Sequence, residues 1–140
     1  MNRLLAILLL VIATTPALRA DQDNVRCLRS TGVQPPLRIQ FGLQSESDSS
    51  AYVLYQGHQA PIPLKLLKVT ELRRGEGGRP SEFETQWIEV TAQATAGRYL
   101  YTNEGALIDD FQYIRGDGRI VRFVDDADVL DVGRCTWAPL

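Results

Sequence analysis

The sequence predicts an all-β fold, a small antiparallel barrel or sandwich of about seven to eight strands. Short apolar segments alternate with polar residues at the two-residue period that is typical of half-buried strands. Clusters of Gly, Pro, Asn and Asp, which favour turns, separate these segments. No helical periodicity follows the first twenty residues, so we expect residues 21–140 to form a single β domain.

Residues 1–20 have the features of a secretory signal peptide. Arg3 precedes the apolar run Leu4–Ala13, and Pro16 and a small exit residue, Ala20, follow it. The run has about half of the ~20 residues that a helix needs to cross a bilayer. We therefore expect a cleaved signal peptide, a mature chain from Asp21, no membrane span, and export to the periplasm of a Gram-negative bacterium.

The first half of the predicted domain contains three strands. Leu37–Leu43 alternates apolar and polar residues after a pair of prolines that sets its start. Ala51–Tyr55 and Ile62–Val69 flank the turn Gln56–Gln59, which predicts a hairpin. The following segment, Arg73–Pro80, has three glycines and no apolar side chain apart from its proline, so it is predicted to be a surface loop.

The second half of the chain continues this pattern. Its predicted strands are one that begins at Phe83, then Gly97–Thr102, Ala106–Arg115 and Ile120–Phe123. The alternation changes phase after Trp87, which predicts a β-bulge near that residue. Gly116-Asp117-Gly118 is the strongest hairpin signal in the chain. A single helical turn within Asp125–Asp131 is expected before the chain ends.

The two cysteines, Cys27 and Cys135, lie near the two ends of the predicted domain. An oxidising compartment would join them in one disulfide that ties the chain ends together. Closing a loop of roughly 100 residues contributes on the order of 4 to 5 kcal/mol in the chain-entropy model. The cysteines lack Cys-x-x-Cys spacing and a neighbouring histidine, which favours a structural role over a redox or catalytic one.

Composition and motifs argue against several function classes. The chain has 15 basic and 17 acidic residues, and loss of Arg3 and Arg19 with the signal peptide makes the net charge about −4, unlike a nucleic-acid binder. A single histidine, His58, cannot form a multi-histidine zinc site. Neither a nucleophile elbow nor a phosphate-binding loop occurs. We therefore expect no enzymatic activity, no metal and no cofactor.

Two groups of carboxylates leave alternatives open. The first lies near the chain end and consists of Asp125, Asp126, Asp128 and Asp131. It offers oxygen ligands for Ca²⁺ but lacks the glycine turn and closing glutamate of an EF-hand loop, and a solvated acidic turn is the competing interpretation. The second group is Glu104, Asp109 and Asp110. It could supply a carboxylate pair for glycoside hydrolysis, and charges that protect strand edges explain it equally well.

Tyrosine, arginine and neighbouring polar residues gather at the predicted strand ends and turns of the last hairpins. Tyr and Arg often anchor protein interfaces because they bury a large area and still satisfy their polar tips. The residues predicted to contact a partner are Tyr99, Tyr101, Asn103, Glu104, Asp117 and Arg119. The alternative is that the tyrosines are ordinary core residues of the strands.

Four segments lie between the early and the late cysteine: Tyr52–Gly57, Leu64-Lys65, Ala96–Tyr99 and Glu104–Ala106. This layout resembles the periplasmic and membrane-bound C-type lysozyme inhibitor family, small eight-stranded β-barrels closed by a disulfide. Members of that family insert a loop into the lysozyme cleft. Their Ser-Gly-x-x-Tyr motif appears here only as Ala96-Gly97-Arg98-Tyr99, without the serine and with altered spacing. Asn103-Glu104-Gly105 replaces their Lys-Gly motif.

We expect an exported binding protein that neutralises another protein. The resemblance implies a lysozyme or another cell-wall hydrolase as the partner, and an immunity protein against a periplasmic toxin is the related possibility. An acidic domain would attract a basic partner electrostatically. The alternative is a small-ligand-binding or envelope-structural barrel without an inhibitory role. A ligand carrier needs a sizeable internal pocket, whereas an inhibitor has a packed core and exposed contact loops.

Overall fold

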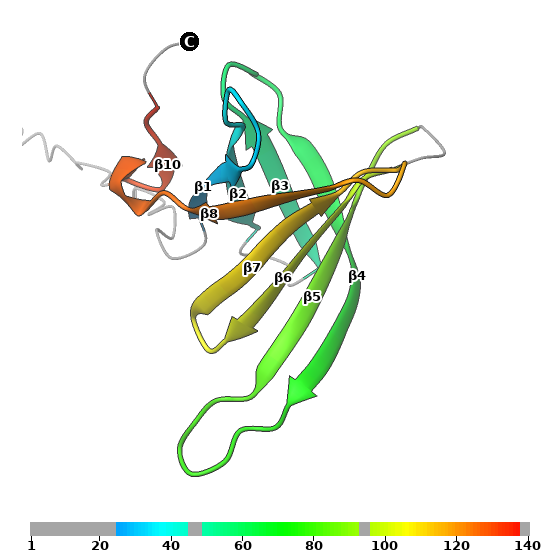
Figure 1. Ribbon diagram of the computed structural model, residues 1–140, viewed down its shortest axis with the longest axis vertical. Coiled ribbons are helices and arrows are strands. Elements are labelled where there is room, and N and C mark those ends of the chain that lie inside the picture. Colours follow the sequence, from blue (N-terminus) through cyan, green and yellow to red (C-terminus); the bar gives the residue numbers. More distant parts are fainter. Residues whose placement is uncertain (1–24, 45–48, 93–95, 138–140) are drawn as a thin grey trace, which may run out of the picture.

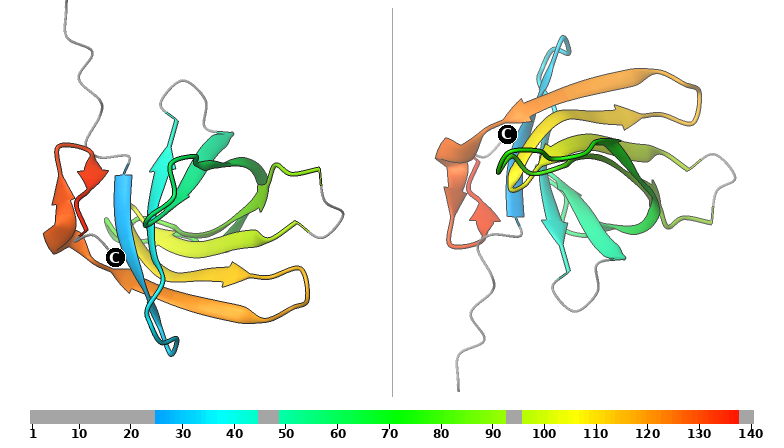
Figure 2. Two further views of the ribbon diagram at one scale, coloured as in Figure 1. Left: turned by 90° about the horizontal axis from the view of Figure 1, so that it is seen from above. Right: turned by 90° about the horizontal axis from the view of Figure 1, so that it is seen from below.

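The computed structural model describes residues 25–44, 49–92 and 96–137. Within these ranges eight antiparallel strands close into a barrel (Figures 1 and 2), and each strand pairs with its sequence neighbours while the first pairs with the last. The strands are β1 (Val25–Thr31), β2 (Arg38–Leu43), β3 (Ser50–Tyr55), β4 (Ile62–Arg73), β5 (Glu82–Glu89), β6 (Arg98–Glu104), β7 (Leu107–Ile114) and β8 (Ile120–Asp125). The expected all-β fold is confirmed as a closed barrel.

Some sequence expectations lie outside the described residues. The predicted signal peptide and the mature start at Asp21 belong to residues 1–24, which the structure does not describe. In the described part of the chain, no helix is long and apolar enough to cross a membrane.

Aromatic side chains fill the centre of the barrel. Phe41 contacts the rings of Trp87, Tyr101 and Phe111 edge-on, with ring centroids 5.4 to 6.2 Å apart. The buried core cluster contains Leu28, Ile39, Phe41, Ala51, Val53, Leu64, Trp87, Tyr99, Tyr101, Phe111 and Phe123. These residues come from all eight strands, because the alternation of each strand turns one set of side chains inward.

Strand β1 was not expected from the sequence, because two of its inward-facing positions hold polar residues: Arg26 lies opposite Phe41, and Ser30 lies opposite Phe123. Cys27 is opposite Gln40 and Leu28 is opposite Ile39 in the pairing with β2. Leu28 points into the core, whereas Cys27 lies on the outer face and is covered there by the end of the chain. Arg29 and Thr31 on the same outer face are exposed. Burial therefore alternates along the second half of the strand, but hydrophobicity does not, and the pattern by which the other strands were predicted is absent.

The bulge expected near Trp87 lies on the neighbouring strand, so the prediction that β5 carries it was wrong. Thr85 and Trp87 are both buried and keep the inward alternation of β5. The register shifts instead between Leu66 and Lys68, which face Trp87 and its neighbour from β4. An extra residue on β4 therefore absorbs the change of twist at this point.

The last described residues form a short strap against the outside of the barrel, beside β1 (Figure 2). The strap contains the 3-10 helix η2 (Ala127–Val129) and the two-residue strands β9 (Leu130–Asp131) and β10 (Arg134–Cys135). Cys135 forms the predicted disulfide with Cys27, and its backbone N–H donates to Oε1 of Gln40 at 2.8 Å. The expected helical turn and the disulfide are thus both present.

Candidate functional site: a cleft at the mouth of the barrel

The barrel wall has a gap between β1 and the first half of β7. Strand β8 pairs with β1 over Leu28–Thr31 and with β7 over Phe111–Ile114. Leu107–Asp109 therefore pairs with β6 on one side and with no described strand on the other, and Asp110 is paired on neither side. The guanidinium of Arg26 reaches across the gap and donates from Nη2 to the carbonyl of Ala106 at 2.7 Å. We call this gap the β1–β7 cleft.

A β-bulge in β7 lies where the cleft begins. The register between β6 and β7 shifts between Leu100 and Thr102, which leaves an extra residue on β7. Asp110 in this segment has a φ of 51°, a left-handed conformation that is uncommon for residues other than glycine. Because a bulge bends the strand that contains it, the start of β7 diverges from β8 at this residue.

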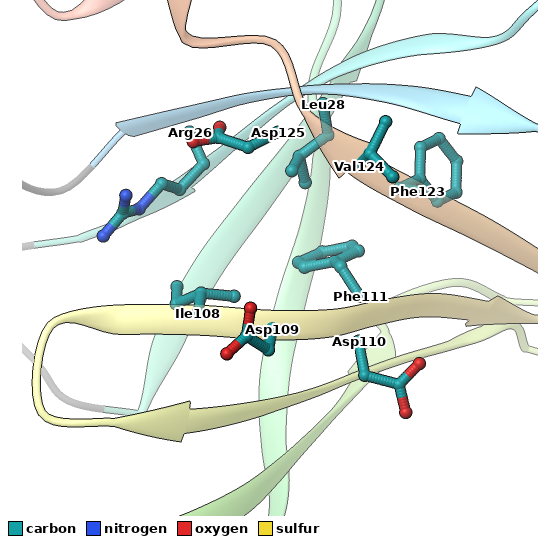
Figure 3. A pocket seen from close by; sticks show the side chains of 9 residues that line it. All are labelled: Arg26, Leu28, Ile108, Asp109, Asp110, Phe111, Phe123, Val124 and Asp125. Atoms are coloured by element: carbon teal, nitrogen blue, oxygen red, sulfur yellow. The ribbon is translucent and has the colours of Figure 1, made fainter.

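The cleft contains a cavity of about 240 Å³ with an apolar floor and a charged rim (Figure 3). The floor consists of the buried side chains of Leu28, Phe111 and Phe123, with half-buried Ile108 beside them. Charged side chains from three strands surround it: Arg26 from β1, Asp109 and Asp110 from β7, and Asp125 from β8. The rim therefore has three carboxylates and one guanidinium.

A second cavity of about 200 Å³ lies on the other side of Arg26 and Ile108, and we call it the mouth cavity. Its remaining lining residues are Phe41, Leu43, Tyr101, Asn103, Gly105 and Ala106. Both cavities are at the same end of the barrel, where β1 and β7 begin. Arg26 and Ile108 line both cavities.

The carboxylates of the rim differ in their partners. Asp110 accepts a hydrogen bond from Nη1 of Arg122 at 2.9 Å. Among the described residues, neither Asp109 nor Asp125 forms an ion pair, and both are exposed. Two carboxylates therefore remain available to a cation that enters the cleft.

The six residues predicted to contact a partner are divided by the structure. Tyr99 is 0% exposed and belongs to the core, so a partner would not touch it in this structure. Tyr101 is 6% exposed, and it lines the mouth cavity together with Asn103. Glu104 lies at the same end of the barrel and pairs with Arg73 at 3.2 Å. Three of the six residues are thus brought together near the mouth.

The remaining two predicted residues lie far from that group along the strands. Asp117 and Arg119 form an ion pair of 2.6 Å in the turn between β7 and β8, at the opposite end of the barrel (Figure 1). This interaction lowers the pKa of the Asp117 carboxyl to about 2. A single partner surface is therefore expected to include one group or the other.

Sequence reasoning missed a polar cluster at that opposite end. Glu89 accepts a hydrogen bond from the backbone N–H of Gly97 at 3.0 Å and one from the Tyr99 hydroxyl at 3.4 Å. The Tyr99 hydroxyl also contacts that of Tyr55 at 2.9 Å, and the Tyr99 ring stacks on Tyr113 with centroids 4.7 Å apart. Extending the alternation of Thr85 and Trp87 by two residues would have placed Glu89 inside the barrel.

The surroundings of this cluster raise the pKa values of its three tyrosines. Burial raises the pKa of Tyr113 to about 12, and the nearby Glu89 carboxylate contributes in the same direction. Burial also raises the pKa values of Tyr55 and Tyr99. All three hydroxyls therefore remain protonated donors at neutral pH.

The two carboxylate alternatives find little geometric support. No group of His, Cys, Asp or Glu suited to holding a metal ion occurs in residues 25–44, 49–92 and 96–137, which include the acidic cluster Asp125–Asp131. In the second group, Glu104 is paired with Arg73 and Asp110 with Arg122, whereas Asp109 faces the β1–β7 cleft.

Comparison of the chain with protein-family models, with curated proteins and with solved structures finds no match.

Proposed function

We propose that this protein is exported and neutralises another protein by binding it at the mouth of the barrel. The observation that carries the proposal is the combination of a filled interior with a recessed, charged surface at one end. Tyr101, Asn103 and Glu104, three of the residues predicted to contact a partner, lie at that end.

The filled interior supports protein binding over the carriage of a small ligand. Phe41, Trp87, Tyr99 and Phe111 occupy the centre of the barrel and are at most 2% exposed. The cavities of about 240 and 200 Å³ lie at the mouth and are smaller than the ~300 to 1,000 Å³ of typical small-molecule sites. A recess of this size fits a side chain of a partner better than a whole ligand.

The disulfide and the charge agree with a role outside the cytoplasm. The Cys27–Cys135 bond joins β1 to the strap, and such bonds persist in oxidising compartments. The acidic balance of the chain favours a basic partner. Together with the resemblance in the sequence, these features make a C-type lysozyme the first target to test and a secreted cell-wall hydrolase the second.

The test uses the full chain, expressed in a Gram-negative host and purified from the periplasmic fraction. Titration calorimetry with a C-type lysozyme is combined with an assay of cell-wall lysis, and the same pair of measurements is repeated with a bacterial cell-wall hydrolase. We expect a stoichiometric complex and loss of lysis. Absence of binding to both enzymes at micromolar concentration would refute these targets. A small molecule that co-purifies in native mass spectrometry would favour the carrier alternative.

A further inference from the structure

We propose that the β1–β7 cleft binds an extended, basic segment of the partner protein by adding it as a strand to the free edge of β7. This inference rests on the proposed function and deepens it, because it assigns the part of the partner that the barrel recognises. Three features of the cleft support it: an unpaired strand edge, a side-chain-sized recess and an acidic rim.

The unpaired edge is the first feature. Leu107–Asp109 forms a ladder with β6, the bulge residue Asp110 has no register partner, and the ladder between β7 and β8 begins only at Phe111. The carbonyl of the preceding residue, Ala106, already accepts a hydrogen bond from the Arg26 side chain across the gap. A strand edge with unsatisfied backbone groups is a template for an added strand. An extended peptide in this gap would find backbone partners along β7.

The recess is the second feature. An added strand directs alternate side chains to the same face, so one of them would enter the cavity beside Ile108. The floor formed by Leu28, Phe111 and Phe123 is apolar, and the charges lie at the rim (Figure 3). Lysine and arginine have this distribution, with an aliphatic stem and a charged head. The stem would cover the floor while the head reaches the rim.

The charge of the rim is the third feature, and it favours a partner segment of positive charge. Asp109 and Asp125 have no ion pair among the described residues, and Arg26 is the single basic residue that lines the cavity. An acidic segment would meet two uncompensated carboxylates, whereas a lysine or arginine would be attracted to them.

A second copy of this chain fits the edge less well. Antiparallel pairing of two β7 edges would bring Asp109 and Asp110 of one copy close to the same residues of the other. Like charges that face each other across strands are destabilising. The occupant favoured by the cleft is therefore a segment of a different, basic protein.

The test does not need the natural partner. The probe is a blocked five-residue peptide, Ac-Thr-Lys-Val-Lys-Thr-amide, in which both lysines lie on the same face of an extended strand. It is titrated into the isotope-labelled protein, and the backbone amide signals are monitored by NMR. The control peptide has glutamate in place of both lysines. We expect saturable amide shifts at Arg26 and Leu107–Asp110 with the lysine peptide at millimolar concentration. The glutamate peptide should produce none, and added salt should weaken the binding.

Matched variants test the rim. The double variant Asp109→Asn with Asp125→Asn should weaken binding of the lysine peptide about ten-fold, because two exposed charge pairs are lost. Asp128→Asn, which removes an exposed carboxylate from η2 outside the cleft, should leave it unchanged. Circular dichroism should show the same thermal midpoint for all three proteins.

Several outcomes would overturn the inference. One is that the amide shifts caused by the lysine peptide are absent or fall outside the cleft. Others are that the glutamate peptide binds as tightly as the lysine peptide, or that the double variant binds the lysine peptide as tightly as the wild type does. Amides of Leu107–Asp109 that donate to β6 are protected in any case. Slow hydrogen exchange in the free monomer at the amides of this segment that face away from β6 would show that the chain already covers the edge. Dimerisation that protects those amides would assign the edge to a second copy. If lysozyme is inhibited equally by the wild type and the double variant, the cleft is refuted and the proposed function stands. If the lysine peptide binds the cleft but lysozyme does not bind the protein, the cleft is supported and lysozyme is refuted as the target.

Discussion

Replacing Gly97 with alanine tests the packing of the polar cluster at the end of the barrel opposite the mouth. A Cβ at this position would lie 2.6 Å from Cζ of Tyr113, closer than side-chain carbons approach such atoms, so the ring would have to move. The ring stacks on Tyr99, which in turn donates from its hydroxyl to Glu89. Gly97 therefore provides the space that this arrangement needs.

The magnitude follows from what the displaced ring would lose. An added methyl group that forces packed side chains to move costs about 1 to 3 kcal/mol, and part of this is the loss of an aromatic pair worth about 0.5 to 1.5 kcal/mol beyond burial. Alanine also lowers the conformational entropy of the unfolded chain relative to glycine, which stabilises the folded state by about 0.4 to 1 kcal/mol. We expect Gly97→Ala to reduce the free energy of unfolding by about 1 to 2 kcal/mol. The thermal midpoint should fall by roughly 4 to 8 °C.

A double-mutant cycle tests whether the Tyr113 ring causes the loss of stability in Gly97→Ala. Urea unfolding is measured for the wild type, Gly97→Ala, Tyr113→Leu and the double variant. If the tyrosine ring is the obstacle, the Gly97→Ala substitution should cost little or nothing once Tyr113 has been replaced by leucine. An equal cost in both backgrounds would refute the reasoning, and so would a single variant as stable as the wild type.

Three further predictions concern the disulfide, the pH dependence and the end of the barrel that binds. Replacing both Cys27 and Cys135 with serine should lower the free energy of unfolding by up to about 4 to 5 kcal/mol, because the 108-residue separation closes a long loop; an unchanged urea midpoint would contradict this. Tyr113 has a native pKa of about 12 and an unfolded value near 10, so its contribution to stability is complete below pH 10 and is lost as the pH rises toward 12. Urea midpoints at pH 8, 10 and 11 should fall less steeply in Tyr113→Phe than in the wild type, and parallel curves would exclude this tyrosine. Asn103→Ala should weaken binding of the protein partner about five-fold without changing the thermal midpoint, whereas Asp117→Ala should not affect binding; calorimetry with the reverse result would move the interface to the opposite end.

Most of the strands could be predicted from local patterns in the sequence. The segments Leu37–Leu43, Ala51–Tyr55 and Ile62–Val69 correspond to β2, β3 and the first part of β4. The Gly116–Gly118 signal lies in the turn between β7 and β8. These elements have one buried face and one exposed face, so the two-residue period is visible in the sequence itself. Strand β1 has the polar residues Arg26 and Ser30 at inward-facing positions, so its sequence lacks this period, and it was missed for that reason.

Missing β1 also hid the most important residue of the cleft. Arg26 has no distinguishing motif, and its importance depends on its position opposite Phe41, on the inward side of a strand. The tyrosines show the opposite limitation. Tyr99 and Tyr101 have the chemistry of interface residues, but strand alternation turns both into the barrel, and of the two Tyr101 lines the mouth cavity. Residue type alone does not distinguish a core tyrosine from a contact tyrosine.

The sequence by itself determined the all-β class, most of the strand and turn positions, and the pairing of its two cysteines. These features depend on neighbours in the chain or on a simple count. Only the tertiary structure decided that the sheet closes through β1 and β8, and that the bulge at Asp110 separates β7 from β8. Barrel closure and register depend on contacts between residues far apart in the sequence, and a shift of one residue would reverse which side chains face inward. The cleft therefore follows from long-range pairing, which no local pattern encodes.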